Sequence, residues 1–286
     1  MKLFFYRDQK GMANFGDDLN LWLWEKLIPG VFDQDESSIF VGIGTILNDG
    51  VPRANRTVVF GSGVGYRATI PRIDSSWKVY CVRGPLSANA LGLDSSFSVA
   101  DAGLLLAKVY SRKSTMGKIK YSLMPHALST QDGGSVYARV CSDMGIGLID
   151  AREPIETVLE KISATEVLLT EAMHGAIAAE ALGVPWVPIA TRKFIYPFKW
   201  HDWCASMSLE YKPEHLFPLW NPSKEQTFID SVRRKSKEFI VSMKLRKIIN
   251  RCKPIGASED LRQEKIDTLY CRLMEFEQDY NDGMFK

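Results

Sequence analysis

Short apolar runs recur along the first two thirds of the chain, and glycine or small polar residues follow most of them. Runs of three or four apolar residues are too short for helices and suit the buried strands of a parallel sheet. These runs lie at residues 3–6, 39–41, 58–60, 79–82, 97–99, 121–124, 146–149, 167–169 and 186–189. Apolar residues at helical spacing follow several of them, first at residues 19–27. Strands that alternate with helices or glycine turns predict an α/β protein with parallel, doubly wound sheets.

A polar stretch at residues 111–118 interrupts this alternation, which then starts again. We therefore expect two Rossmann-like domains, at residues 1–112 and 118–222, with loops that face each other across a cleft. Residues 223–286 are predicted to form a C-terminal helical extension.

The extension contains two helices of opposite charge. Residues 224–253 hold ten basic and three acidic residues, whereas residues 259–286 hold four basic and eight acidic residues. The first helix carries an apolar stripe at Phe228, Val232, Phe239 and Met243, and the second one carries Leu269, Leu273, Phe276 and Tyr280. An antiparallel pair docked on the body is the simplest interpretation. Peripheral membrane contact through the basic helix 224–253 is the alternative.

Composition excludes several classes of protein. The 286 residues carry 36 Lys+Arg against 34 Asp+Glu, so no general basic surface favours a nucleic-acid partner. No apolar run approaches the roughly 20 residues that span a bilayer, and the first residues do not resemble a secretory signal. Five scattered cysteines suggest reduced thiols and no metal framework. We expect a cytoplasmic protein, with attachment to the inner face of the membrane as a further option.

The stretch 165–185 offers the strongest candidate chemistry. A buried strand at 167–169 precedes Thr170, a residue type that caps helices, and then a helix-forming run. His174 and Gly175 therefore lie at the carboxyl end of a parallel strand, where ligands bind in such sheets. Backbone N–H groups at a helix start favour an anion, and an imidazole there can donate a proton. A histidine that only caps or packs is the other interpretation.

Seven motifs, in this order and with this approximate spacing, resemble the polysaccharide pyruvyl transferase family over roughly residues 1–190. They are Asn14-Phe-Gly-Asp17, Gly42-Ile-Gly44, Phe60-Gly-Ser-Gly63, Val82-Arg-Gly-Pro85, Asp101-Ala-Gly103, Pro125-His126 and Met173-His-Gly175. The resemblance implies a fold similar to the two-domain B-type glycosyltransferases. It also implies phosphoenolpyruvate as donor, a saccharide acceptor that is free or lipid-linked, and a ketal product of exopolysaccharide biosynthesis. Neither a cofactor nor a metal is expected.

The family pattern assigns roles to particular residues. Arg83 and His174 match the arginine and histidine that surround phosphoenolpyruvate, with His174 as general acid poised near neutral pH. A glycine turn at Gly61, Ser62 and Gly63 is expected to bind substrate. An ion pair that braces its turn is the alternative for Arg83.

The remaining candidates lie in the loops of both halves. His126 either transfers a proton or binds a substrate, or it is a core or capping residue. Asp17 is the candidate base for an acceptor hydroxyl, although helix capping explains at least one of Asp17 and Asp18. Asn14 shapes this loop or contacts the sugar.

The chain departs from the family pattern at Ala172, where many relatives carry arginine two residues before the late histidine. Arg83, Arg192 or Lys193 is expected to supply the missing positive charge. Two alternatives stay open: a glycosyltransferase of this fold that uses a nucleotide sugar, and an inactive saccharide-binding protein.

Overall fold

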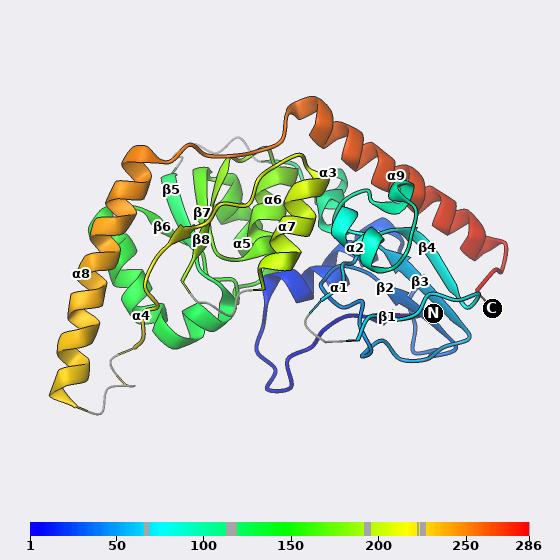
Figure 1. Ribbon diagram of the computed structural model, residues 1–286, viewed down its shortest axis with the longest axis horizontal. Helices are drawn as coiled ribbons and strands as arrows, with labels where there is room; N and C mark the ends of the chain where they lie inside the picture. Colours follow the sequence, from blue (N-terminus) through cyan, green and yellow to red (C-terminus); the bar gives the residue numbers. More distant parts are fainter. Residues whose placement is uncertain (66–68, 113–118, 192–195, 222, 224–226, 286) are drawn as a thin grey trace.

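Two parallel β-sheets organise the chain, one in each half, and helices surround them (Figure 1). The computed structural model describes residues 1–65, 69–112, 119–191, 196–221, 223 and 227–285. Arg192 and Lys193 lie outside these residues. The predicted α/β class is confirmed. The division at residues 112, 118 and 222 stays a prediction.

The first sheet is built from strands in their order along the chain. It consists of β1 (Lys2–Phe4), β2 (Ser38–Val41), β3 (Arg56–Phe60) and β4 (Trp77–Cys81). Helix α1 (Phe15–Leu27) connects β1 to β2, whereas the described parts of the next two connections contain no helix. Because every connection moves the same way across the sheet, this half is not doubly wound, and that part of the prediction is wrong.

The second sheet reverses direction in its middle. Its strands, in spatial order, are β6 (Gly147–Leu148), β5 (Ile119–Met124), β7 (Thr165–Thr170), β8 (Trp186–Ala190) and β9 (Glu214–His215). Helix α4 (Ala127–Met144) connects β5 to β6, its neighbour on one side. Helix α6 (Met173–Ala181) connects β7 to β8, its neighbour on the opposite side, and α5 (Ile155–Ser163) connects β6 to β7. The connections after β5 and β7 therefore diverge, which creates the topological switch point where α/β sheets bind ligands.

Shorter elements complete the first half. They are α2 (Pro85–Ala90), η1 (Ser95–Phe97), η2 (Ala102–Leu105) and α3 (Leu106–Val109). The strand expected at 97–99 is wrong, because the chain there forms η1 and a single bridge between Val82 and Ser98. A short apolar run is buried equally well in either form.

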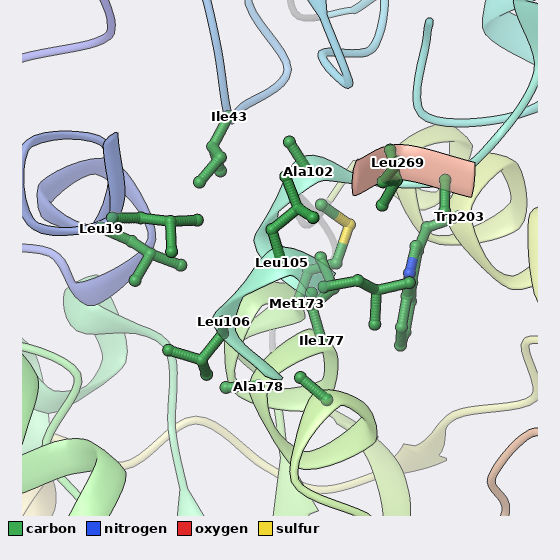
Figure 2. Close-up of a cluster of buried hydrophobic side chains, with 14 of the residues drawn as sticks. Leu19, Ile43, Ala102, Leu105, Leu106, Met173, Ile177, Ala178, Trp203 and Leu269 are labelled. Atoms are coloured by element: carbon green, nitrogen blue, oxygen red, sulfur yellow. The ribbon is translucent and has the colours of Figure 1, made fainter. Parts of the chain in front are cut away.

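Helix α7 (Pro197–Ser206) links the two halves. It follows β8 in the second sheet and packs against α2 of the first half. Trp200 and Trp203 on this helix are fully buried. One apolar cluster consequently runs through both halves, and Figure 2 shows Leu19 of α1 and Met173 of α6 within it.

The two C-terminal helices pack on different sheets. Helix α8 (Phe228–Arg251) lies against α4 at the outer side of the second half, and α9 (Glu259–Asn281) lies over the first half (Figure 1). The predicted antiparallel pair is therefore wrong. The reason is that Ile255, in the segment between them, pairs with Trp186 and carries the chain across the molecule.

The predicted buried face is correct for α9 and wrong for α8. Leu269, Leu273 and Phe276 of α9 are fully buried, as predicted. On α8 the buried apolar residues are Val241, Leu245 and Ile248 instead of the predicted stripe. In the described part of the chain, no helix is long and apolar enough to cross a bilayer.

Candidate functional site

A cavity of about 460 Å³ lies between the two halves, at the carboxyl ends of β5 and β7. Its walls come from both sheets. The first half contributes Phe4, Tyr6, Asn14, Phe15, Gly16, Asp17, Gly44, Thr45, Ile46, Asn48 and Gly50, and the second contributes His126, Leu128, Ala172, Met173, His174 and Lys199. The structure thus brings four of the predicted residues together: Asn14, Asp17, His126 and His174.

His174 lies in the first turn of α6, at the floor of this cavity, with its side chain 15% exposed. Thr170 does not cap this helix as expected, because its hydroxyl bonds to the backbone of Ala172. Ala172 is the N-cap, and its methyl side chain makes no capping hydrogen bond to the first turn. The first N–H groups of α6 are therefore available to an anion in the cavity.

Gly16 makes room for the imidazole of His174. A Cβ atom at Gly16 would lie 2.0 Å from Nδ1 of His174, far inside van der Waals contact. Any side chain there would displace the ring. The motif at residues 14–17 and the motif at residues 173–175 consequently meet in the cavity. Glycine is required at position 16 because the imidazole of His174 lies against it.

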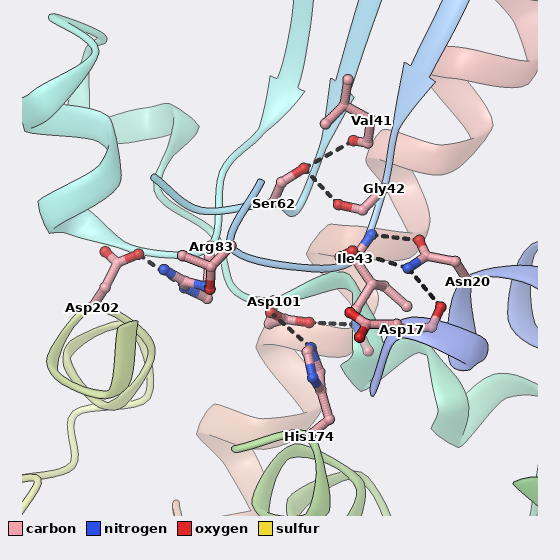
Figure 3. Close-up of polar contacts among 12 residues, drawn as sticks. Asp17, Asn20, Val41, Gly42, Ile43, Ser62, Arg83, Asp101, His174 and Asp202 are labelled. Carbon is pink, nitrogen blue, oxygen red and sulfur yellow. Dashed lines mark hydrogen bonds and ion pairs between the residues drawn. The ribbon is translucent and has the colours of Figure 1, made fainter. Parts of the chain in front are cut away.

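Asp101 faces the other side of the same ring. Its Oδ2 lies 3.9 Å from Nε2 of His174, and Figure 3 shows the two side chains directed toward each other. Within the described residues neither atom has a hydrogen-bond partner, although both are buried. The other oxygen, Oδ1, accepts a hydrogen bond from the backbone N–H of Gly103 (2.9 Å), which holds the carboxyl group in place.

Burial controls the charge of this pair. It lowers the pKa of His174 to about 3, and the positive charges of Lys199 and Arg83 act in the same direction. Burial raises the pKa of Asp101 to about 6, against the opposing effect of Arg83. At neutral pH the protein thus holds a neutral imidazole beside a carboxylate. The pKa near neutrality that the sequence analysis expects for His174 is not found in the protein alone.

His126 both caps a helix and lines the cavity. Its Nδ1 accepts a hydrogen bond from the N–H of Leu128 (3.2 Å) at the start of α4. Its own backbone N–H donates to Oε2 of Glu171 (3.0 Å). Oε1 of the buried Glu171 accepts from the N–H of Thr191 (2.7 Å), so one carboxylate fixes the ends of both β5 and β8. Sequence reasoning missed Glu171, although an acidic residue directly after a buried strand is a signal.

Asp17 projects into the cavity from α1. Its Oδ2 accepts a hydrogen bond from the side-chain amide of Asn14 (2.6 Å). The neighbouring Asp18 accepts from the backbone N–H of Asn14 (3.0 Å), the N-cap residue of α1, so neither acid is itself the N-cap that was expected. Burial raises the pKa of Asp17 to about 6, while Asn14 and Lys199 oppose the shift. Asp17 is therefore mainly ionised at neutral pH and can accept a proton.

Lys199, in the first turn of α7, brings a positive charge to the cavity. It is half-buried and near enough to affect the pKa of both Asp17 and His174. The sequence pattern does not single out Lys199, because the segment around it shows no regular spacing. The helix only becomes evident once Trp200 and Trp203 are seen to be packed in the core.

Arg83 is not among the residues that line the cavity, and its role in substrate binding stays a prediction. Its guanidinium is fully buried, and Nε donates to Oδ2 of Asp202 on α7 (3.0 Å; Figure 3). Nη1 donates to Oγ1 of Thr45 (2.7 Å), whose other side lines the cavity. Asp202 also accepts from the N–H of Ser87 (3.0 Å) in α2. Arg83 thus joins α7 to the first half, as the alternative interpretation proposed.

The predicted glycine turn is also structural. The hydroxyl of Ser62 donates to the carbonyl oxygens of Val41 (2.9 Å) and Gly42 (2.5 Å), and Ser62 is fully buried. Gly61 packs on Ala102 and Gly63 packs on Arg83, where a Cβ would come within 2.5 Å and 2.1 Å. None of the three residues lines the cavity.

Gly175 is a similar case. A Cβ there would lie 2.5 Å from the sulfur of Met124, so this glycine allows α6 to lie close to β5. It does not line the cavity either.

The loop after β2, and not the glycine turn at residues 61–63, forms this part of the cavity wall. Asn20 of α1 holds it: its Nδ2 donates to the carbonyl of Ile43 (2.9 Å) and its Oδ1 accepts from the N–H of Ile43 (2.8 Å). Gly44 and Thr45 follow in the cavity wall. The signal in the sequence was a polar Asn20 on the apolar face of a helix. Across the described ranges, no three His, Cys, Asp or Glu side chains gather as a metal site.

Comparison with known proteins agrees with the sequence pattern. The family model described as polysaccharide pyruvyl transferase matches residues 4–193. The chain is 36% identical over 219 residues to the succinoglycan biosynthesis protein ExoV of Rhizobium meliloti (strain 1021), an alignment that covers 76% of this chain and 68% of that protein. No solved structure matches the chain.

Proposed function

Because this chain belongs to the polysaccharide pyruvyl transferase family, we propose that it transfers the pyruvyl group of phosphoenolpyruvate to two hydroxyls of a saccharide. The product is a cyclic ketal, and phosphate is released. The observation that carries the proposal is the cavity in which His174, Asp17 and Lys199 meet. The relative's name links that protein to succinoglycan, which supports an exopolysaccharide acceptor here.

The donor is an anion at two ends, so its pocket needs positive charge and N–H donors. Lys199 supplies the charge that Ala172 lacks, since both residues line the same cavity. The uncapped first turn of α6 supplies backbone donors beside it. We assign the phosphate or the carboxylate of the donor to the space between Lys199 and the first turn of α6. His126, which also lines the cavity, is assigned to substrate binding.

His174 acts as the general acid in this proposal. Burial is the main cause of its low pKa, and the cations Lys199 and Arg83 add to the shift; the negative charge of a bound donor would act in the opposite direction. Donor binding should therefore raise the pKa of His174 and protonate it, with the Asp101 carboxylate stabilising the imidazolium from 3.9 Å away. The imidazolium then gives its proton to the methylene carbon of phosphoenolpyruvate, and a positive charge develops at the adjacent carbon.

Asp17 acts as the base. A saccharide hydroxyl attacks the adjacent carbon and its proton passes to the Asp17 carboxylate. The bond between that carbon and the phosphate oxygen breaks, and a second hydroxyl closes the ring and releases a second proton. One proton has entered the methyl group and two have left hydroxyls, so the surplus proton leaves with phosphate or solvent. The donor supplies its own leaving group, and we assign no cofactor.

The architecture and the cellular location belong to the same proposal. The two α/β halves on either side of a cavity are compatible with the B-type glycosyltransferase architecture. We place the reaction in the cytoplasm, where phosphoenolpyruvate is made.

Calorimetric titration tests the donor assignment. Wild-type protein, Lys199→Met and the control Lys212→Met, whose side chain is 76% exposed, are titrated with phosphoenolpyruvate and with nucleotide sugars. We expect saturable binding of phosphoenolpyruvate that is about tenfold or more weaker in Lys199→Met, because a charged hydrogen bond is lost. The control should bind as wild type. Binding of a nucleotide sugar, with none of phosphoenolpyruvate, would overturn the proposal in favour of a glycosyltransferase.

A further inference from the structure

Helix α8 exposes a row of large apolar side chains to solvent. The exposed fractions are 83% for Phe228, 60% for Ile229, 47% for Val232, 67% for Phe239 and 55% for Met243. These five residues are half of the exposed large apolar side chains in the C-terminal third of the described chain. A helix that held this row only for packing on its own protein would bury it.

The row lies opposite the face that packs on the protein. At about 100° per residue, Phe228, Val232, Phe239 and Met243 fall within an arc of about 60°. Val241 and Ile248, which are buried against the second half, project about 170° away from the middle of that arc. The helix therefore has two apolar faces, and only one of them has a partner in the described protein.

Positive charge surrounds the exposed row. Helix α8 carries eight Lys+Arg and two Asp+Glu. Some of these cations serve the packed side: Arg234 bonds to Glu238, and Lys244 lies over Phe217. Others are exposed along the row itself or beside it, namely Arg233, Lys235, Arg246, Lys247 and Arg251.

We propose that this outer face of α8, defined by Phe228, Ile229, Val232, Phe239 and Met243 with the adjacent cations, lies in the headgroup layer of an anionic lipid bilayer. Apolar side chains between lysines and arginines are the features of helices that lie in the plane of a membrane surface. The helix does not cross the bilayer, and its 24 residues lie along the surface for about 36 Å.

The charges favour a bilayer over a second copy of the chain. In a two-fold symmetric dimer the same patch meets itself, so the cations Lys235 and Arg246 of one copy would lie against the cationic patch of the other. Like charges at such close range oppose association. Anionic headgroups compensate the same cations. This inference goes beyond the proposed function and holds whether or not phosphoenolpyruvate is the donor.

Vesicle flotation of the purified full-length protein tests the inference. The probes are phosphatidylcholine vesicles and vesicles with about 30% phosphatidylglycerol. One variant replaces the apolar row (Phe239→Ser with Met243→Ser) and another reverses the charge (Lys235→Glu with Arg246→Glu). The control is Leu21→Ser, an apolar side chain of α1 that is 50% exposed.

We expect wild type and control to bind the anionic vesicles and to release them in high salt. Each α8 variant should bind about tenfold or more weakly, with an unchanged melting temperature and unchanged affinity for phosphoenolpyruvate. Equal binding by wild type and both variants, or no binding to anionic vesicles, would overturn the inference. So would light scattering that detects a dimer in wild type and a monomer in the Phe239 variant, since the row would then be a protein interface.

Discussion

The carboxyl edges of the two sheets carry similar sequence patterns and have different uses. In the second sheet, the turns after β5 and β7 open into the cavity with His126 and His174. In the first sheet, the turns after β3 and β4 are closed, because Ser62 and Arg83 are fully buried in internal contacts. The turns after β1 and β2 of the first sheet do reach the cavity, with Asp17 and Thr45, whereas in the second sheet the connections diverge between β5 and β7, where α/β sheets bind ligands.

The closed turns after β3 and β4 still contribute to the site indirectly. Arg83 bonds to Asp202 of α7, the helix that also brings Lys199 to the cavity. The open turns of both sheets thus supply groups that touch the substrate in our proposal, whereas the closed turns after β3 and β4 hold the helix that positions Lys199. Substitutions at the open turns and at the closed turns should therefore change different measured quantities.

Replacing His174 with alanine should give the largest effect on turnover. We expect phosphate release to slow by about 10²- to 10⁴-fold, the usual contribution of a general acid, with the affinity for phosphoenolpyruvate within a few fold of wild type. Donor binding by wild type should take up a proton, which calorimetry detects as a heat that depends on the ionisation enthalpy of the buffer. This dependence should disappear in His174→Ala.

His215→Ala provides the control, since His215 is an exposed histidine of β9. It should keep both turnover and proton uptake. Wild-type turnover in His174→Ala would remove this residue from the mechanism. Complete loss of donor binding would make it an anchoring residue instead of an acid.

Replacing Arg83 should change stability first. Arg83→Met leaves the carboxylate of Asp202 buried without its cation, and breaking such a pair typically costs about 3–5 kcal/mol. Thermal unfolding should therefore begin at a clearly lower temperature, whereas Lys199→Met should melt close to wild type and lose donor affinity. Adding Asp202→Asn to Arg83→Met should restore part of the stability. An Arg83 variant that melts normally and fails only to bind the donor would return Arg83 to the substrate site.

Local patterns were sufficient to predict much of the second sheet. The apolar run at 167–169, the small residues after it and the histidine between them predict a strand, a close helix and a ligand junction, because each property depends on neighbours in sequence. The buried face of α9 was predictable for the same reason: Leu269, Leu273 and Phe276 recur at helical spacing, and α9 has no competing apolar face.

Properties that depend on distant partners were not predictable. Whether Arg83 touches a substrate or an internal acid depends on Asp202, more than a hundred residues later in the chain. Lys199 reaches the cavity only because α7 crosses to the first half. Helix α8 has two apolar faces, and the spacing of Phe228 and Val232 does not reveal that α4 packs on the other one.

Asp101 and Asp94 allow the smallest and sharpest comparison, between a buried cap and an exposed one. Each aspartate begins a short 3-10 helix and accepts a hydrogen bond of 2.9 Å from the N–H two residues later, Gly103 or Ser96. Their pKa values move in opposite directions: burial raises that of Asp101 to about 6, whereas hydrogen bonds from Ser96 lower that of Asp94. The same local geometry therefore has opposite consequences for stability.

A carboxyl group whose pKa is raised on folding binds its proton more tightly in the folded state. Ionising Asp101 therefore costs stability progressively as pH rises from about 4 to about 6, and the full cost remains above that range. Asp101→Asn keeps the cap and removes the charge, so it should raise the free energy of unfolding at pH 7 by roughly 2–3 kcal/mol and leave it unchanged near pH 3. Asp94→Asn should be slightly destabilising at pH 7. Denaturant unfolding at both pH values measures the two differences, and a less stable Asp101→Asn at neutral pH would mean that the buried carboxylate stabilises the fold. If that variant is more stable but slower, the protein keeps a destabilising charge beside His174 because the reaction needs it.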